Sequence, residues 1–161
     1  MTSRADLLIA TLGLQPHPEG GHYGEVHRSS LLVQPLDERG TRAALTTIYF
    51  LLTAGEVSRW HRVQSDEVWH FYEGAPLRHW VADPASGSIT CVELGRVEGN
   101  QRPVRAVPAG CWQAARTSGE YTLVGCTVGP GFDFNDFMLA TDSPQAAERL
   151  GQHSPILAEL L

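Results

Sequence analysis

The spacing of hydrophobic and polar positions changes twice along this 161-residue chain. Near the N-terminus, apolar residues recur at the spacing of one helix face. Ser3, with Asp6 three residues later, forms a capping-box variant ahead of this stripe, and Gly13 follows it. The pattern predicts a helix over about residues 3–13, which must end before the proline-rich segment 16–21. The stripe consists of Leu7, Leu8, Leu12 and Leu14.

From about residue 23 to residue 139 the pattern is typical of strands. Short runs of β-branched and aromatic residues alternate with turn signals such as Asp37-Glu38-Arg39-Gly40. We therefore expect many short antiparallel strands, folded as a sandwich or barrel. Helix returns over about residues 143–161, where Ser143-Pro144 begins a segment that Gly151 ends and Ser154-Pro155 begins another. Without an internal repeat or linker, residues 1–161 are expected to form a single domain.

Composition narrows the class of protein. Hydrophobic residues make up 42% and charged residues 19% of the chain, a normal balance for a globular domain. The net charge of −6 disfavours nucleic-acid binding, which requires a basic surface. Apolar runs fall far short of the roughly 20 residues that span a bilayer, and we expect no secretory signal or membrane partner. Cys91, Cys111 and Cys126 form no C-x-x-C pair and suit reduced thiols in the cytoplasm.

Candidate chemistry is concentrated between residues 55 and 74. Gly55, His61, Glu67 and Gly74 stand at the spacing of the first cupin motif, with Val63 in place of its second histidine. A segment that resembles the second motif follows at Pro108-Ala109-Gly110, with Gln113 where a histidine would stand and Arg102 where the opening glycine would stand.

A finer resemblance covers about residues 10–140. Four blocks in order are similar to the signatures of one small orphan cupin family, which has no agreed activity. The resemblance implies an all-β cupin jelly roll, or double-stranded β-helix, that is usually a homodimer. It also implies structural kinship to dTDP-sugar epimerases and to seed-storage and auxin-binding cupins. The blocks are residues 16–23, residues 60–62 with 66–69, residues 108–114 and residues 130–137.

The motif positions argue against a firm metal site. A cupin metal centre takes two histidines from one strand, a glutamate from the next and a third histidine from a later strand. Here Val63 offers no donor and Gln113 offers only a neutral amide oxygen, which leaves His61 and Glu67 as strong ligands. We expect no cofactor and a substantially metal-free protein, in which His61, Glu67 and Gln113 are at most a weak remnant of a metal site.

Without metal, His61 and Glu67 are the candidate catalytic pair. Residues two apart on a strand share a face, so both should point into the barrel. An imidazole beside a carboxylate suits general acid or base chemistry, and Glu67 should raise the pKa of His61. Gln113 could hydrogen-bond a substrate oxygen. The alternative is that His61 and Glu67 form a buried ion pair with no chemical role.

Other residues are weaker candidates for the ligand pocket. Trp69 and Phe71 would supply stacking faces, and Tyr23 and Glu25 would close one rim unless they belong to a solvated or dimer-facing edge strand. His79 is a pocket or surface residue, and the best spare metal ligand if its strand runs beside that of Glu67.

Several further positions have competing interpretations. Asp136 caps the barrel mouth or holds a turn. His70 and Tyr72 fall on the opposite face from Glu67, where dimer packing is the better interpretation. The recurring histidines at 17, 22 and 27 lie in a proline-rich lead-in, which is a poor metal cage.

Three functions fit these observations. The leading hypothesis is a cytoplasmic dimeric cupin that binds a small molecule and acts as a metal-independent isomerase or epimerase on a sugar-like or nucleotide-sugar substrate. The alternatives are a metal-dependent cupin oxygenase that uses His61, Glu67 and Gln113, and a non-catalytic protein that binds a small ligand.

Overall fold

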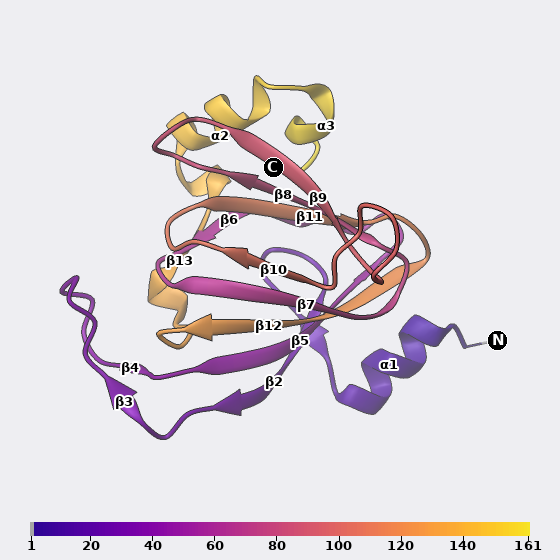
Figure 1. Ribbon diagram of the computed structural model, residues 1–161, viewed down its shortest axis with the longest axis horizontal. Coiled ribbons are helices and arrows are strands. Elements are labelled where there is room, and N and C mark those ends of the chain that lie inside the picture. Colours follow the sequence, from indigo (N-terminus) through magenta and orange to yellow (C-terminus); the bar gives the residue numbers. More distant parts are fainter. Residues whose placement is uncertain (1) are drawn as a thin grey trace.

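Two antiparallel sheets face each other in the computed structural model, which describes residues 2–161 (Figure 1). The larger sheet has the order β1-β2-β5-β12-β7-β10 and the smaller has the order β13-β6-β11-β8-β9. The larger sheet comprises β1 (Gln15–Pro16), β2 (His22–Arg28), β5 (Thr46–Thr53), β7 (Asp66–Gly74), β10 (Val104–Val107) and β12 (Tyr121–Gly129). The smaller comprises β6 (Ser58–Val63), β8 (Leu77–Ala82), β9 (Ile89–Leu94), β11 (Trp112–Thr117) and β13 (Phe137–Leu139).

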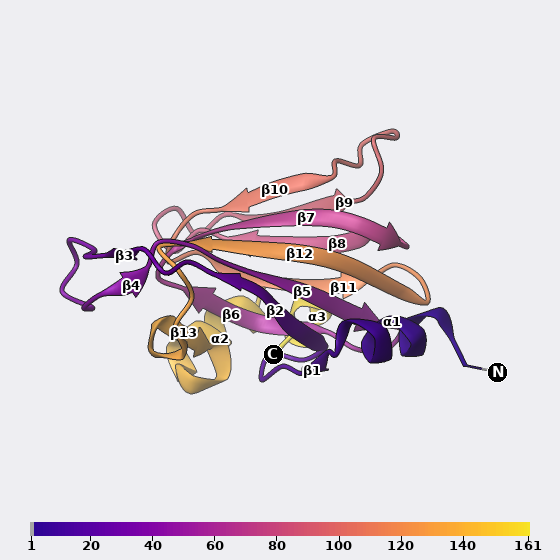
Figure 2. The same ribbon diagram turned by 90° about the horizontal axis from the view of Figure 1, so that it is seen from below.

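A separate two-stranded ladder, β3 (Leu32–Val33) with β4 (Arg42–Ala43), projects beyond the end of the barrel (Figure 2). Two short 3-10 helices, η1 (Phe134–Asp136) and η2 (Ala140–Asp142), flank β13. Among residues 2–161, no helix combines the length and apolar character that a membrane crossing requires.

The N-terminal helix α1 (Arg4–Leu12) has the predicted capping box. The Ser3 hydroxyl accepts a hydrogen bond from the Asp6 backbone N–H, and the Asp6 carboxylate accepts one from the Ser3 N–H, both at 3.1 Å. Gly13 ends the helix with φ 63° and ψ 37°, a left-handed conformation that glycine adopts without steric cost. These local signals confirm the predicted boundaries.

The C-terminal helices α2 (Pro144–Gly151) and α3 (Pro155–Ala158) begin where the sequence predicts. Ser143 and Ser154 are their N-caps, each followed by proline at the first helical position. Helix α2 ends at Gly151, as predicted, although its C-cap is Gln152 in a right-handed conformation.

Three apolar clusters hold these layers together. The first fills the space between the sheets and includes Phe50, Trp69 and Val124. The second joins the outer face of the smaller sheet to α2 and α3, where the Trp60 indole N–H donates to the Leu157 carbonyl at 3.0 Å. The third packs α1 against the outer face of the larger sheet. The barrel is thus fixed from both ends of the chain, while one mouth stays open as a cavity.

Candidate functional site

A cavity of about 330 Å³ opens into the barrel between the two sheets. Strands β2, β5, β6, β7 and β12 line it, together with a segment of residues 17–21, here called the strap, and the loop that precedes η1. This volume lies at the lower end of the range of small-molecule sites, roughly 300–1,000 Å³. The ionisable groups on its wall include His17, Glu19, His61 and Glu67.

Strand β6 turns His61 toward this cavity and leaves the side chain only 2% exposed. The Nδ1 atom of His61 lies 2.8 Å from the carbonyl oxygen of Arg59, so Nδ1 must carry a proton and donate it. The other ring nitrogen, Nε2, lies 3.3 Å from Oε2 of Glu19. One proton between Nε2 and Oε2 is needed to make that contact favourable.

The strap brings Glu19 to this position. Its carboxylate accepts a hydrogen bond from the Ser58 hydroxyl at 2.7 Å, and its backbone N–H donates to Nδ1 of His17 at 3.1 Å. Gly20 has φ 109°, and a side chain there would collide with the backbone carbonyl of Val57. Only glycine therefore lets the strap lie flat on the barrel rim and hold Glu19 inside.

Burial controls the protonation of this pair. It raises the pKa of Glu19 to about 8 and lowers that of His61, because a charge is poorly solvated there. Burial, reinforced by the neighbouring His61, lowers the pKa of His17 to about 3 and keeps that ring neutral. Near neutral pH, Glu19 and His61 thus hold one shared proton inside the barrel.

Glu67 reaches the same cavity from β7 and has different partners. Its Oε2 accepts a hydrogen bond from the Gln113 amide at 2.5 Å, and the Oε1 of Gln113 accepts one from Nε2 of His79 at 3.1 Å. Burial raises the pKa of Glu67 to about 7; His61 opposes that rise and Glu19 adds to it. This carboxyl changes charge near physiological pH.

The relation of His61 to Glu67 differs from the sequence expectation. Both side chains line the cavity, but among the described residues the acidic partner of His61 within 4.0 Å is Glu19. Glu67 does favour the charged imidazole, yet burial outweighs that effect and the pKa of His61 falls rather than rises. Sequence spacing predicts which face of a strand a side chain occupies. It does not predict how strongly burial in the folded structure will shift the pKa of that side chain.

Four predicted pocket residues do not line the cavity, although all point into the barrel. Trp69 lies deeper and packs against His79, with ring centroids 4.5 Å apart, and Phe71 packs against the same inner cluster. Gln113 lies behind Glu67 and is connected to the cavity wall by its hydrogen bond to the Glu67 carboxylate. His79 is fully buried on β8, in the opposite sheet from β7, and its pKa falls to about 3 through burial. His79 is therefore not a surface residue. Its strand also does not run beside β7, which carries Glu67.

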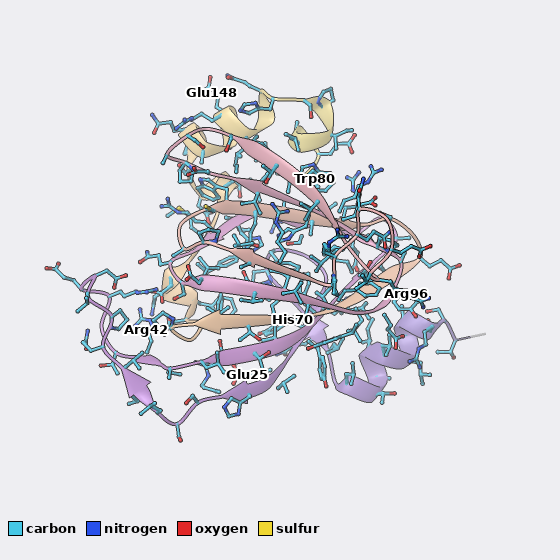
Figure 3. The ribbon with its side chains drawn as sticks, viewed as in Figure 1. Glu25, Arg42, His70, Trp80, Arg96 and Glu148 are labelled. Carbon is cyan, nitrogen blue, oxygen red and sulfur yellow. The ribbon has the colours of Figure 1, made fainter. Side chains whose placement is uncertain are left out.

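The remaining predicted residues lie at the rim or outside it. Tyr23 and Glu25 line the cavity from β2, and the Glu25 carboxylate accepts a hydrogen bond from Arg28 at 2.8 Å. Asp136 is buried but does not line the cavity. Arg42 donates a hydrogen bond to each of the two carboxylate oxygens of Asp136, both at 2.8 Å. The neighbouring guanidinium lowers the pKa of Asp136. Asp136 thus anchors the projecting hairpin, whose Arg42 is labelled in Figure 3.

Sequence reasoning missed Glu19, whose carboxylate lies 3.3 Å from His61 Nε2. Block 16–23 contributed to the family resemblance, but no chemical role was assigned to Glu19. The signal that could have found it is a glutamate followed by two glycines in a proline-rich lead-in. Phe132 and Phe134, which wall the cavity mouth, were likewise noted only as part of a block.

The donor set does not fit a cupin metal centre. Val63 lines the cavity without a ligand atom, and the Gln113 amide is engaged with Glu67 and His79. Among residues 2–161 no group of three or more His, Cys, Asp or Glu side chains is arranged to hold a metal ion. The chemistry of the site is therefore derived from its ionisable side chains.

Comparison with known proteins identifies the family. The sequence profile described as "Cupin superfamily (DUF985)" matches residues 6–140. The chain belongs to this cupin family. Its two facing sheets are accordingly those of a cupin jelly roll, with short helices at both ends, as the resemblance predicted.

Solved structures place this cupin among uncharacterised relatives. A protein from Shewanella oneidensis is 35% identical, with a TM-score of 0.84 and coverage of 98% of this chain and 97% of the other. A hypothetical protein from Leishmania major is also 35% identical, with a TM-score of 0.85 and 98% coverage of both chains. Oxalate decarboxylase from Bacillus subtilis, 16% identical over 87% of this chain and 31% of its own, shares the fold, with a TM-score of 0.59. No match was found among curated proteins.

Proposed function

We propose that this small-molecule-binding cupin isomerises or epimerises a sugar-like or nucleotide-sugar substrate without a metal, by moving a proton to and from carbon. The observation that carries the proposal is the pair Glu19–His61, which holds a proton in the cavity that the ionisable Glu67 also lines. Removing a proton from carbon next to a carbonyl requires a base whose pKa lies near the working pH. The pKa of Glu67, about 7, meets that requirement.

The contacts suggest a division of roles. Gln113 holds one oxygen of Glu67, and we assign the second oxygen as the base toward a ligand. His61 is the complementary acid, and Glu19 supplies and recovers its proton across 3.3 Å. Phe132 and Phe134 offer apolar faces that would cover a sugar or nucleotide ring at the mouth.

Kinship with dTDP-sugar epimerases is consistent with this reaction, although similarity of fold carries limited weight for function. The oxygenase alternative is weaker because the donor set lacks the second and third histidines. The proposal places the reaction in the cytoplasm, where the three free cysteines would stay reduced.

Solvent exchange tests the reaction class. Ligands that co-purify would first be identified by native mass spectrometry, and keto-sugar nucleotides would then be incubated with the protein in D₂O. We expect deuterium to replace the hydrogen on the carbon beside the carbonyl. Glu67→Gln and His61→Asn should slow this exchange by about 100-fold or more, in line with the loss of a general acid or base.

The control is Glu120→Gln, which removes an exposed carboxylate away from the cavity and should leave the exchange rate unchanged. Ligand binding without exchange would contradict the enzyme proposal and support the non-catalytic binding protein. Stoichiometric Fe, Mn or Zn with metal-dependent O₂ consumption would instead support the oxygenase.

We also propose a homodimer formed through the outer face of the larger sheet. Helix α1 covers one part of this face, while Tyr72 and Val104 are about half exposed beside His70. Sedimentation velocity should show a dimer that Tyr72→Glu converts to monomer. Val97→Glu, at an exposed position in the loop after β9, should remain dimeric. A monomeric wild-type protein would contradict this proposal.

A further inference from the structure

A second cavity, of about 220 Å³, lies on the outside of the barrel, between the smaller sheet and α2. Strands β6 and β11 contribute Arg62 and Trp112 to its wall. Helix α2 and the residues after it contribute Arg149, Leu150 and His153. The cavity is separate from the one that holds His61, and the proposed reaction makes no use of it.

The arginines of this cavity stand out from the rest of the chain. All 12 basic residues are arginine, and nine of their side chains donate a hydrogen bond or form an ion pair. Among residues 2–161, the three whose guanidinium has no such partner are Arg62, Arg96 and Arg149. Two of these three line the same cavity. Arg62 is half-buried, where an unpaired charge is unfavourable.

Acidic groups do not neutralise this site. Asp83 is the one carboxylate among the lining residues, and its two oxygens are already engaged. One accepts from the Ala85 backbone N–H at 2.9 Å and the other from the Ser86 hydroxyl at 2.8 Å. The lining thus presents two guanidinium groups and an imidazole, in a chain whose net charge is −6.

The wall also fixes the orientation of one guanidinium. The Arg62 guanidinium carbon lies 5.0 Å from the centroid of the Trp112 ring. A guanidinium held against an aromatic face keeps its in-plane N–H donors free for a carboxylate or phosphate. Ile89 and Leu150 add an apolar surface beside these donors.

We propose that this cavity binds a compact organic anion, either a phosphate monoester or a carboxylate. Arg62 and Arg149 would hold its charged group, while Ile89 and Leu150 would contact its apolar part. The volume of 220 Å³ is below the usual range for drug-sized ligands, so a dinucleotide is too large.

The two cavities lie on opposite faces of strand β6. Arg62 is the neighbour of His61 on β6, and Trp112 is the neighbour of Gln113 on β11. These positions also pair across the strands, with Trp112 opposite Arg62 and Gln113 opposite His61. Because alternate residues face opposite sides, strand β6 contributes His61 to the inner cavity and Arg62 to the outer one. The proposal of an anion site does not depend on the proposed isomerase activity.

Titration followed by NMR tests the site directly. The ¹⁵N-labelled protein would be titrated at constant ionic strength with inorganic phosphate, glycerol 3-phosphate or benzoate in separate experiments. We expect saturable shifts of the Trp112 indole and Arg62 Nε signals with at least one probe. The probe with the lowest Kd shows whether phosphate or carboxylate is the preferred group.

Three variants make the test specific. Arg149→Gln, at an exposed helix position, and Arg62→Gln should each weaken binding at least tenfold. Arg96→Gln removes the third unpaired arginine, which lies after β9 and away from α2 (Figure 3), and should leave Kd unchanged. If Arg62→Gln fails to fold, Arg149→Gln alone decides. Shifts that never saturate with any probe, or equal weakening by Arg96→Gln, would overturn the proposal.

Discussion

The two halves of the barrel interior differ in chemistry, although β5, β7 and β12 contribute to both. At the mouth, Glu19, His61 and Glu67 surround a cavity, and burial moves the pKa of each away from its ordinary value. Deeper in, Trp69 and His79 pack closely, with ring centroids 4.5 Å apart. Side chains of both halves face inward, so facing direction does not distinguish them. Depth along the strand is what separates the reactive region from the structural one.

Polar groups in the two halves are also satisfied differently. In the deep half, His79 and Gln113 form a directed chain of neutral donors and acceptors that ends on Glu67. At the mouth, Glu19 and His61 need a proton between them to interact favourably. The first arrangement rigidifies the barrel, whereas the second can exchange a proton with a ligand.

Removing the deep aromatic ring should give the largest effect. Trp69→Ala should lower the free energy of unfolding by about 3–5 kcal/mol, because it leaves a void in a close-packed cluster. Tyr23→Ala at the mouth should cost much less, since that ring already borders open space. Urea unfolding would measure both, and equal losses would contradict the separation into packed and open halves.

Breaking the chain between the halves should have an intermediate effect. Gln113→Leu deprives Glu67 of its amide donor and leaves His79 Nε2 without an acceptor. An unsatisfied buried group costs about 1–3 kcal/mol. His79 is fully buried, whereas Glu67 borders the cavity, so a loss of about 1–3 kcal/mol is expected, mainly from His79. Gln34→Leu on the exposed hairpin, measured by the same urea titration, should change stability by less than about 0.5 kcal/mol. A Gln113→Leu loss no larger than that of Gln34→Leu would contradict this assignment.

The pH dependence of stability should show the smallest and most specific effect. Glu19 and Glu67 bind protons more tightly in the folded state than in the unfolded one, where their pKa is about 4.5. Their contribution to stability is therefore lost as pH rises from about 4.5 to about 7 for Glu67 and to about 8 for Glu19, by at most about 1.4 kcal/mol per pH unit for each carboxyl.

The buried histidines have the opposite sign and act in a lower range. The pKa of His17 and of His79 is about 3, so the folded state resists their protonation. Their contribution is consequently lost as pH drops from about 6.5 toward 3. Between about pH 4.5 and 6.5 it offsets that of the carboxyls, so net stability should fall above about pH 6.5 and below about pH 4.5. Glu19→Gln should flatten only the alkaline limb, as measured by thermal unfolding across pH. An unchanged alkaline limb in that variant would contradict the raised pKa of Glu19.

Local chemistry made much of this fold predictable. Ser3 and Asp6 cap α1 through contacts three residues apart, and Ser143-Pro144 begins α2 in the same local way. Period-two alternation also indicated the inward face for His61 and Glu67. Such signals depend only on neighbours along the chain, which is why the sequence reveals them.

The composition of the site was harder to predict. Alternation gives the face of a strand and not the depth, so Trp69 and Phe71 were assigned to the pocket although they pack below it. Glu19 lies in irregular backbone 42 residues before His61, and no periodic signal links such positions. Burial, which decides the pKa of both groups, depends on the folded structure as a whole.

Nitrogen NMR of His61 tests the shared proton most directly. In the wild-type protein, Nδ1 should stay protonated, while the Nε2 signal should shift as pH rises through about 8 and the proton leaves the Glu19–His61 pair. In Glu19→Gln, the Nε2 signal should show no transition near pH 8. An ordinary imidazole titration near pH 6.5 that is identical in both proteins would contradict the account.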